Sequence, residues 1–173
     1  MKKAIAGIAL ALAAMTTPAS ADWIHQKLDD PFQGDQHMAL GADDLGGFVA
    51  IFVCSKADDL SLVFISPEKV DADTLAVVNN IGPHLAVVID DMPKREFNAR
   101  VSSTPDGGSI RIRVEDAGIV QIAADAARAN RRIALAGVVN GKVTESHSFN
   151  PDGSGAAIRA TLKACGVNAP NDQ

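Results

Sequence analysis

Gly46-Gly47-Phe48-Val49-Ala50-Ile51-Phe52-Val53-Cys54 is the stretch that decides the fold. Seven of its nine residues are apolar, and β-branched and aromatic side chains dominate it. A glycine pair opens the stretch and the polar pair Ser55-Lys56 follows it, so the pattern predicts a fully buried central strand.

The last residue of this strand, Cys54, is one of only two cysteines in the chain. The other, Cys165, follows Ile158 and Leu162 at the spacing i, i+4, i+7, which is one face of a C-terminal helix. Two cysteines in an exported chain most often form a disulfide. Because the bridge would close a loop of more than 100 residues, chain entropy alone predicts about 4–5 kcal/mol of stabilisation. A redox-active pair would more often be spaced as Cys-x-x-Cys, so we expect a structural bridge.

The first 21 residues have the pattern of a secretory signal peptide. Met1-Lys2-Lys3 is basic, residues 4–15 are apolar, and Ala19-Ser20-Ala21 is a small-x-small cleavage site. The apolar run is shorter than the roughly 18 residues that span a bilayer, although an uncleaved anchor helix is the alternative. We expect cleavage after Ala21, a single periplasmic or secreted domain over 22–167, and a flexible tail over 168–173.

The charge balance of the mature domain disfavours two classes of partner. Without Lys2 and Lys3 the chain has 14 basic and 21 acidic residues, a net charge of −7. An acidic domain repels phosphate backbones and anionic lipid, so we expect neither nucleic-acid binding nor membrane insertion after signal cleavage. The oligomeric state is left open.

The remaining chain predicts short strands and helices in alternation. Asp71 and Asp116 are candidate helix caps, and Asn140-Gly141 is a hairpin turn. Beside the central strand and an N-terminal strand at Trp23, we expect strands over 36–40, 60–65, 84–90, 96–102, 109–114, 133–139 and 142–149.

Residues 60–101 and 109–149 share one order of elements. Each has a strand, a helix, a strand, a turn and a strand at nearly equal length. The sequence therefore predicts an α+β fold with a mainly antiparallel sheet, two β-α-β-β units, a C-terminal helix and one disulfide.

Several residues are candidates for binding. Trp23 is either packed in the N-terminal strand or exposed for recognition, and the alternation in 109–114 turns Arg111 and Arg113 outward as a possible partner surface.

His37 and Met38 would suit copper in an oxidising compartment, as weak metal candidates. The loop Gly153-Ser154-Gly155 with Arg159 could hold an anion at a helix start, although capping by Asp152 or Ser154 is the simpler interpretation.

No pattern in the sequence indicates catalysis. It has no Gly-x-Ser-x-Gly elbow, no His-Glu-x-x-His, no P-loop and no complete dinucleotide fingerprint. The paired acids of the chain stand at turns, where aspartate bonds nearby backbone amides. We expect no cofactor and no catalytic residue, with a cryptic hydrolase as an alternative.

Four features together carry a resemblance to a known family. They are Trp23 near the mature start, Cys54 ending an apolar strand, the apolar strand that ends at Asp90, and the segment 148–165. The chain resembles the invasion-associated locus B family and related small periplasmic proteins of α-proteobacteria. This resemblance implies a β-rich periplasmic domain without known catalysis, linked in some members to invasion or envelope function. The chain lacks the extra cysteines of that family around residues 95–115, and no functional residue is transferred.

We therefore expect a periplasmic accessory or binding protein whose partner is a protein or an envelope component. The alternative is a periplasmic protein that binds a small ligand, copper or zinc.

Overall fold

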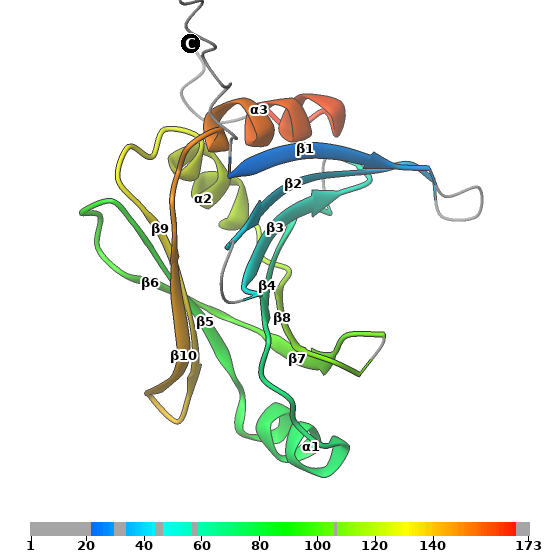
Figure 1. Cartoon of the computed structure of the whole chain (residues 1–173), viewed down its shortest axis with the longest axis vertical. Helices are drawn as coiled ribbons and strands as arrows, with labels where there is room; N and C mark the ends of the chain where they lie inside the picture. The colour runs from blue at the N-terminus through cyan, green and yellow to red at the C-terminus, as the bar shows by residue number, and fades with distance from the viewer. Residues whose placement is uncertain (1–21, 30–33, 44–46, 57–58, 106, 169–173) are drawn as a thin grey trace, which may run out of the picture.

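The computed structural model describes residues 22–29, 34–43, 47–56, 59–105 and 107–168, which form two antiparallel sheets and three helices (Figure 1). The predicted α+β class is confirmed. The signal peptide over 1–21 and most of the predicted tail lie outside the described residues.

The larger sheet, sheet A, has six described strands in the order β1-β2-β3-β4-β8-β7. Their bounds are β1 (Trp23–Leu28), β2 (Gln36–Ala42), β3 (Val49–Cys54), β4 (Ser61–Ser66), β8 (Ile110–Val114) and β7 (Arg100–Ser103). Sheet B has the order β10-β9-β5-β6. Its described strands are β10 (Lys142–Phe149), β9 (Ile133–Val139), β5 (His84–Ile89) and β6 (Arg95–Asn98). The helices are α1 (Ala72–Ile81), α2 (Ile119–Ala126) and α3 (Ser154–Ala164).

The predicted central strand is β3, between β2 and β4. Its inward residues Ala50, Phe52 and Cys54 belong to the core. The prediction that the strand is buried on both faces is wrong, because Val49, Ile51 and Val53 are only half-buried. Helix α3 contacts β1, β2 and β3 on the inner side of the sheet, whereas the outward residues of β3 stay half-buried.

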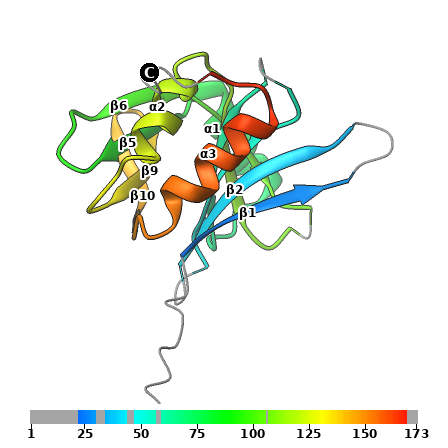
Figure 2. The same cartoon turned by 90° about the horizontal axis from the view of Figure 1, so that it is seen from above.

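The predicted disulfide between Cys54 and Cys165 is confirmed. It joins the end of β3 to the end of α3, which lies across β1 and β2 (Figure 2). Ile158 and Leu162, the predicted inward residues of this helix, are buried beneath it.

Trp23 is a core residue, 2% exposed. Its Nε1 donates to the carbonyl of Asn150 at 2.8 Å. Its indole ring lies against Gly41, where a Cβ atom would overlap the ring. Trp23 is therefore not part of an exposed partner surface, and the packed alternative holds.

The two β-α-β-β units are β4-α1-β5-β6 and β8-α2-β9-β10. Equivalent strands pair with each other, since β4 pairs with β8 and β5 with β9, both antiparallel. This is the pairing that a pseudo-two-fold relation between the units produces. It places α1 and α2 at opposite ends of the molecule (Figure 1).

The single strand expected over 96–102 is wrong. It divides at Ala99, whose N–H donates to the carbonyl of Pro83 at 2.9 Å. Residues before Ala99 form β6 on sheet B, and residues after it form β7 on sheet A. A chain that turns such a corner joins two sheets without a loop.

Helix α1 has the predicted ends. The carboxylate of Asp71 accepts from the Thr74 N–H at 2.8 Å, and Gly82 ends the helix with φ of 82°. The Asn79 side chain donates to the Val101 carbonyl (2.8 Å) and accepts from the Val101 N–H (2.9 Å). It thereby satisfies the backbone of the edge strand β7, which would otherwise be open to pairing with another chain.

Candidate functional site: the outer face of sheet A

The register of sheet A aligns six residues in one row across its outer face. Because paired residues of antiparallel strands direct their side chains to the same face, the pairings place Ile24, Leu40, Ile51, Val63, Arg113 and Arg100 side by side. We call these six residues the outer row. With neighbouring strands about 4.8 Å apart, the row is roughly 24 Å long.

The outer row changes character along its length. Its first four members are aliphatic and its last two are arginines. Ile24 at one end is 52% exposed, Leu40 and Ile51 are half-buried, and Val63 is buried. Neighbouring pairs repeat the pattern: Met38 lies opposite Val53, and Ile65 lies opposite Arg111.

The face is hollowed where the two kinds of side chain meet. Sheet A curves so that its β1–β2 end and its β7–β8 end both extend toward the same side (Figure 1). Between them lies a hollow of about 270 Å³. Its apolar floor comes from Met38, Ile51, Val53, Val63 and Ile65, and its arginines are Arg111 and Arg113.

The arginines of the hollow have partial partners. The Nε of Arg111 donates to Ser102 Oγ at 3.2 Å, and the Nε of Arg113 lies 2.8 Å from Glu115 Oε1. Within the described part of the chain no carboxylate lies at ion-pair distance from Arg111. Arg100 and Arg113 are directly opposite each other, and like charges in that position are unfavourable. Glu115 offsets only one of the two positive charges.

Asp59 also lines the hollow. It accepts from the N–H groups of Ser55 (2.9 Å) and Lys56 (3.0 Å). Burial raises the pKa of the Asp59 carboxyl, but hydrogen bonds from Ser55 and Lys56 lower it more, so the pKa lies below its ordinary value. The negative charge of Asp59 is therefore already stabilised by backbone N–H groups of the turn after β3.

The structure does not bring the metal candidates His37 and Met38 together. The two residues are neighbours on β2, so their side chains point to opposite faces of the sheet. Met38 lines the hollow, whereas the His37 ring stacks on His25 with centroids 5.8 Å apart. The described residues contain no group of three or more histidine, cysteine, aspartate or glutamate side chains that could hold a metal ion.

The candidate anion loop is engaged in packing helices together. Ser154 Oγ donates to the carbonyl of Ala126 (3.0 Å), and Arg159 Nη1 donates to that of Ala127 (3.1 Å). Both groups thus satisfy the C-terminal carbonyls of α2 instead of facing a ligand. Gly153 is the N-cap of α3, without a side-chain cap, so the expected capping by Asp152 or Ser154 is also wrong.

Sequence reasoning identified the arginines of the hollow but missed its apolar floor. Alternation marks Arg111 and Arg113 because polar and apolar residues alternate in β8. In β3 both faces are apolar, so periodicity alone could not indicate that Ile51 and Val53 face outward.

A buried carboxylate was missed as well. Asp125 on α2, with a side chain 7% exposed, is paired with Arg95 and with Arg128 at 2.9 Å. It also accepts from Gln121 Nε2 at 2.9 Å. Burial raises the pKa of Asp125, but hydrogen bonds from Arg95 and Gln121 lower it more, so the pKa lies below its ordinary value. These contacts fasten α2 to β6, so we assign them a structural role.

Comparison of the chain with protein-family models, with curated proteins and with solved structures gave no match. The resemblance to the invasion-associated locus B family therefore stays a prediction. Among the described residues, no helix has the length and apolar character needed to cross a membrane.

Proposed function

We propose that this protein is an exported periplasmic binding module that holds an envelope component with an apolar chain and an anionic group. The ligand lies along the outer row of sheet A, with its chain over Leu40, Ile51 and Val63 and its anionic group at the arginines. The observation that carries the proposal is the change from four aliphatic residues to two arginines within that row.

Both halves of such a ligand gain from the site. Each CH₂ group removed from water contributes about 0.8 kcal/mol. A carboxylate or phosphate at Arg111 and Arg113 forms charge-assisted hydrogen bonds, which are stronger than neutral ones. The net acidity of the domain keeps it away from anionic membrane surfaces, so the module holds single ligand molecules and does not coat a bilayer.

The test is calorimetric titration with dodecanoate and decanoate, each below its micelle concentration, with dodecyltrimethylammonium as the cationic counterpart. We expect dodecanoate to bind more tightly than decanoate by more than tenfold, because two CH₂ groups are worth about 1.6 kcal/mol. The cationic amphiphile is expected to bind far more weakly.

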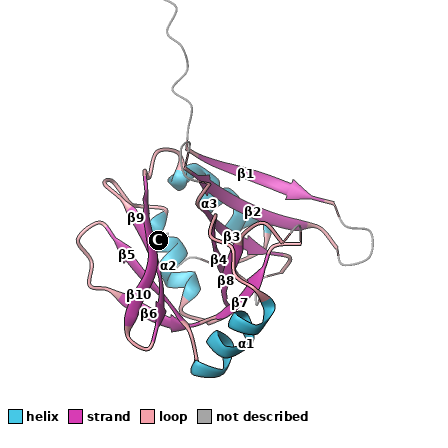
Figure 3. Ribbon diagram, turned by 60° about the horizontal axis from the view of Figure 1, so that its bottom comes forward, coloured by secondary structure: helices cyan, strands magenta, loops and turns pink. Residues whose placement is uncertain are grey.

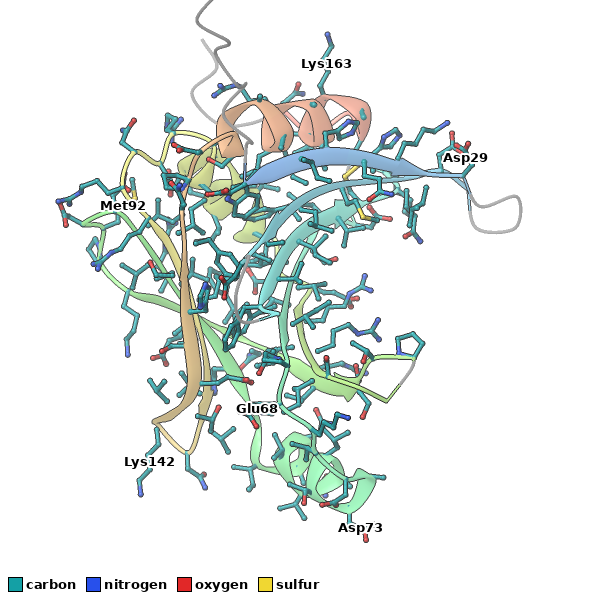
Figure 4. The ribbon with its side chains drawn as sticks, viewed as in Figure 1. Asp29, Glu68, Asp73, Met92, Lys142 and Lys163 are labelled. Carbon is teal, nitrogen blue, oxygen red and sulfur yellow. A yellow bond between two sulfur atoms is a disulfide. The ribbon has the colours of Figure 1, made fainter. Side chains whose placement is uncertain are left out.

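Two variants connect the binding to the site. Arg113→Gln and Arg111→Gln should each weaken dodecanoate binding about tenfold. Lys142→Ala is the matched control, since it also removes one positive charge but lies on the β9–β10 hairpin, away from sheet A (Figure 4). Equal affinity of the anionic and cationic amphiphiles, or an unchanged affinity in both arginine variants, would overturn the proposal. So would cross-linking that captures a protein on this face when no amphiphile binds.

A further inference from the structure

A second hollow lies under α1, on the side of sheet A opposite to the outer row. Its volume is about 270 Å³. It lies between α1, residues Val101 of β7 and Ile110 of β8, and the β9–β10 hairpin. We call it the α1 cleft. Its walls are mainly aliphatic: Val70, Leu75, Val78, Val101, Ile110 and Val139.

One carboxylate points into this cleft from β10. The residues Glu145, His147 and Phe149 alternate on the inward face of the strand, and Phe149 belongs to the core. Glu145 lies opposite Gly137, which has no side chain to fill the same space. The register of β10 also shifts between Val143 and Glu145, and such bulges often re-aim a side chain beside a functional site.

The carboxylate of Glu145 is incompletely satisfied. Its Oε2 is buried and has no hydrogen-bond partner among the described residues. Burial raises the pKa of Glu145, and the neighbouring carboxylate of Glu68 adds to the rise, against a hydrogen bond from Ser66. Buried polar atoms without a partner are uncommon in proteins and call for an explanation.

The charge in the α1 cleft is one-sided. Glu68 is the second acid that lines it, from the segment between β4 and α1 (Figure 4). The other polar lining residues are Thr74 and Thr144, and the lining contains no lysine, arginine or histidine. An apolar hollow with two acids and no internal cation is complementary to a cation with an apolar body.

We infer that the α1 cleft binds a small alkylammonium ion, with its ammonium group at Glu145 and Glu68 and its alkyl chain against the aliphatic walls. Three ammonium hydrogens supply the donor that Glu145 Oε2 lacks. A metal ion fits less well, since the described residues gather no three suitable ligands. An anion is repelled by both carboxylates.

The surroundings leave the cleft accessible. No residue of α1 is buried. Val77 on the helix is 57% exposed, and Val143 on the facing hairpin is 62% exposed. Figure 3 shows α1 beside β7 and β8, and no other helix or strand of the described residues is packed over it.

The experiment is NMR titration of the whole mature protein with protonated n-pentylamine, compared with n-pentanol and pentanoate. We expect saturable shifts of amides in α1, β9 and β10 with pentylammonium, at least tenfold weaker binding of pentanol, and none with pentanoate. Affinity should fall when the pH is lowered from 7 to 4, because protonation removes the charge of Glu145.

Glu145→Gln keeps the size of the side chain and should weaken pentylammonium binding at least tenfold, and Glu68→Gln should weaken it less. Asp73→Asn is the matched control, because it makes the same charge change on α1 at a side chain directed away from the cleft (Figure 4). Its affinity should stay within twofold of wild type. If Glu145→Gln fails to fold, Glu68→Gln and the comparison with pentanol decide the matter.

Two further results complete the test. Nα-acetyl-lysine amide that binds more tightly than pentylammonium would support the same chemistry and identify a lysine of a partner protein as its source. Equal affinity for pentanol and pentylammonium, or unchanged affinity in Glu145→Gln, would overturn the inference.

Discussion

Helices α1 and α2 hold equivalent places in the two β-α-β-β units, yet they differ completely in burial. Six of the eight residues of α2 are buried, whereas none of the ten residues of α1 is. Both helices are rich in apolar residues, so composition does not explain the difference. The difference lies in what packs against each helix.

Helix α2 is covered by α3 and fastened at several points. Ser154 and Arg159 of α3 bind its last carbonyls, and Asp125 pairs with Arg95 of β6. The disulfide in turn holds α3 on sheet A. Helix α1 has the two bonds of Asn79 to β7 and no covering element among the described residues. One end of the space between the sheets is therefore filled by core, and the other retains the α1 cleft.

The largest test of this comparison removes the disulfide. Cys54→Ser should lower the free energy of unfolding by up to about 4–5 kcal/mol, because the bridge closes a loop spanning a sequence separation of 111. Urea unfolding measures the loss, and hydrogen exchange should show that α2 and α3 lose more protection than α1. Cys165→Ser should reproduce the effect, and the double variant should add nothing. Identical unfolding midpoints for wild type and both single variants would contradict the prediction that the disulfide stabilises the fold.

Asp125→Ala should cost on the order of 1–3 kcal/mol, since it removes three charge-assisted hydrogen bonds from a buried site. The folded-state pKa of Asp125 is depressed, so its contribution is complete above the unfolded value near 3.9 and is lost as the pH falls through the folded value. Urea unfolding of wild type and variant at pH 7 and at pH 2–3 checks this. A stability gap that persists undiminished at the lower pH would show that the ionised carboxylate is not responsible.

Asn79→Ala should cost about 1 kcal/mol, because water can replace part of the lost bonding at the exposed edge of β7. Hydrogen exchange should show the amides of α1 and β7 opening while those of α2 are unchanged. Asn80→Ala, at the neighbouring exposed position on the same helix, is the control and should have little effect on exchange. If the two variants behave alike, Asn79 does not hold α1 in place.

The smallest expected effect is a slight gain in stability, in the variant Glu145→Gln. The folded-state pKa of Glu145 is raised, so ionising it disfavours folding once the pH exceeds the unfolded value near 4.3. Glu145→Gln should therefore melt slightly higher than wild type at pH 7 and equally at pH 3.5, in the absence of any amine. Thermal unfolding by circular dichroism measures both. A lower melting temperature of the variant at pH 7 would mean that the charge stabilises the cleft.

Much of the secondary structure followed from local signals. Asp71 and Gly82 mark the ends of α1, and Asn140 and Gly141 adopt positive φ values of 52° and 69° in the predicted hairpin turn. The break at Ala99 was not predictable from the same signals. Nothing local distinguishes one seven-residue strand from two short strands that pair with different sheets.

The candidate sites divide in the same way. Arg111 and Arg113 could be predicted to face outward because they alternate with buried residues in β8. Glu145 could have been recognised by its alternation with Phe149, which places it on the inward face of β10. The apolar floor of the hollow could not be predicted from the sequence, since β3 is apolar on both of its faces.

The sequence by itself determined the α+β class and the two β-α-β-β units, because caps, turns and strand periodicity act between near neighbours in the chain. It also determined the pairing of Cys54 with Cys165, since these are the only two cysteines of the sequence. The tertiary structure alone decided which helix is buried and which face of β3 is open. Both depend on where α3 lies, and the contacts of α3 with α2 and β1 join residues far apart in the sequence. Long-range packing therefore determined both hollows.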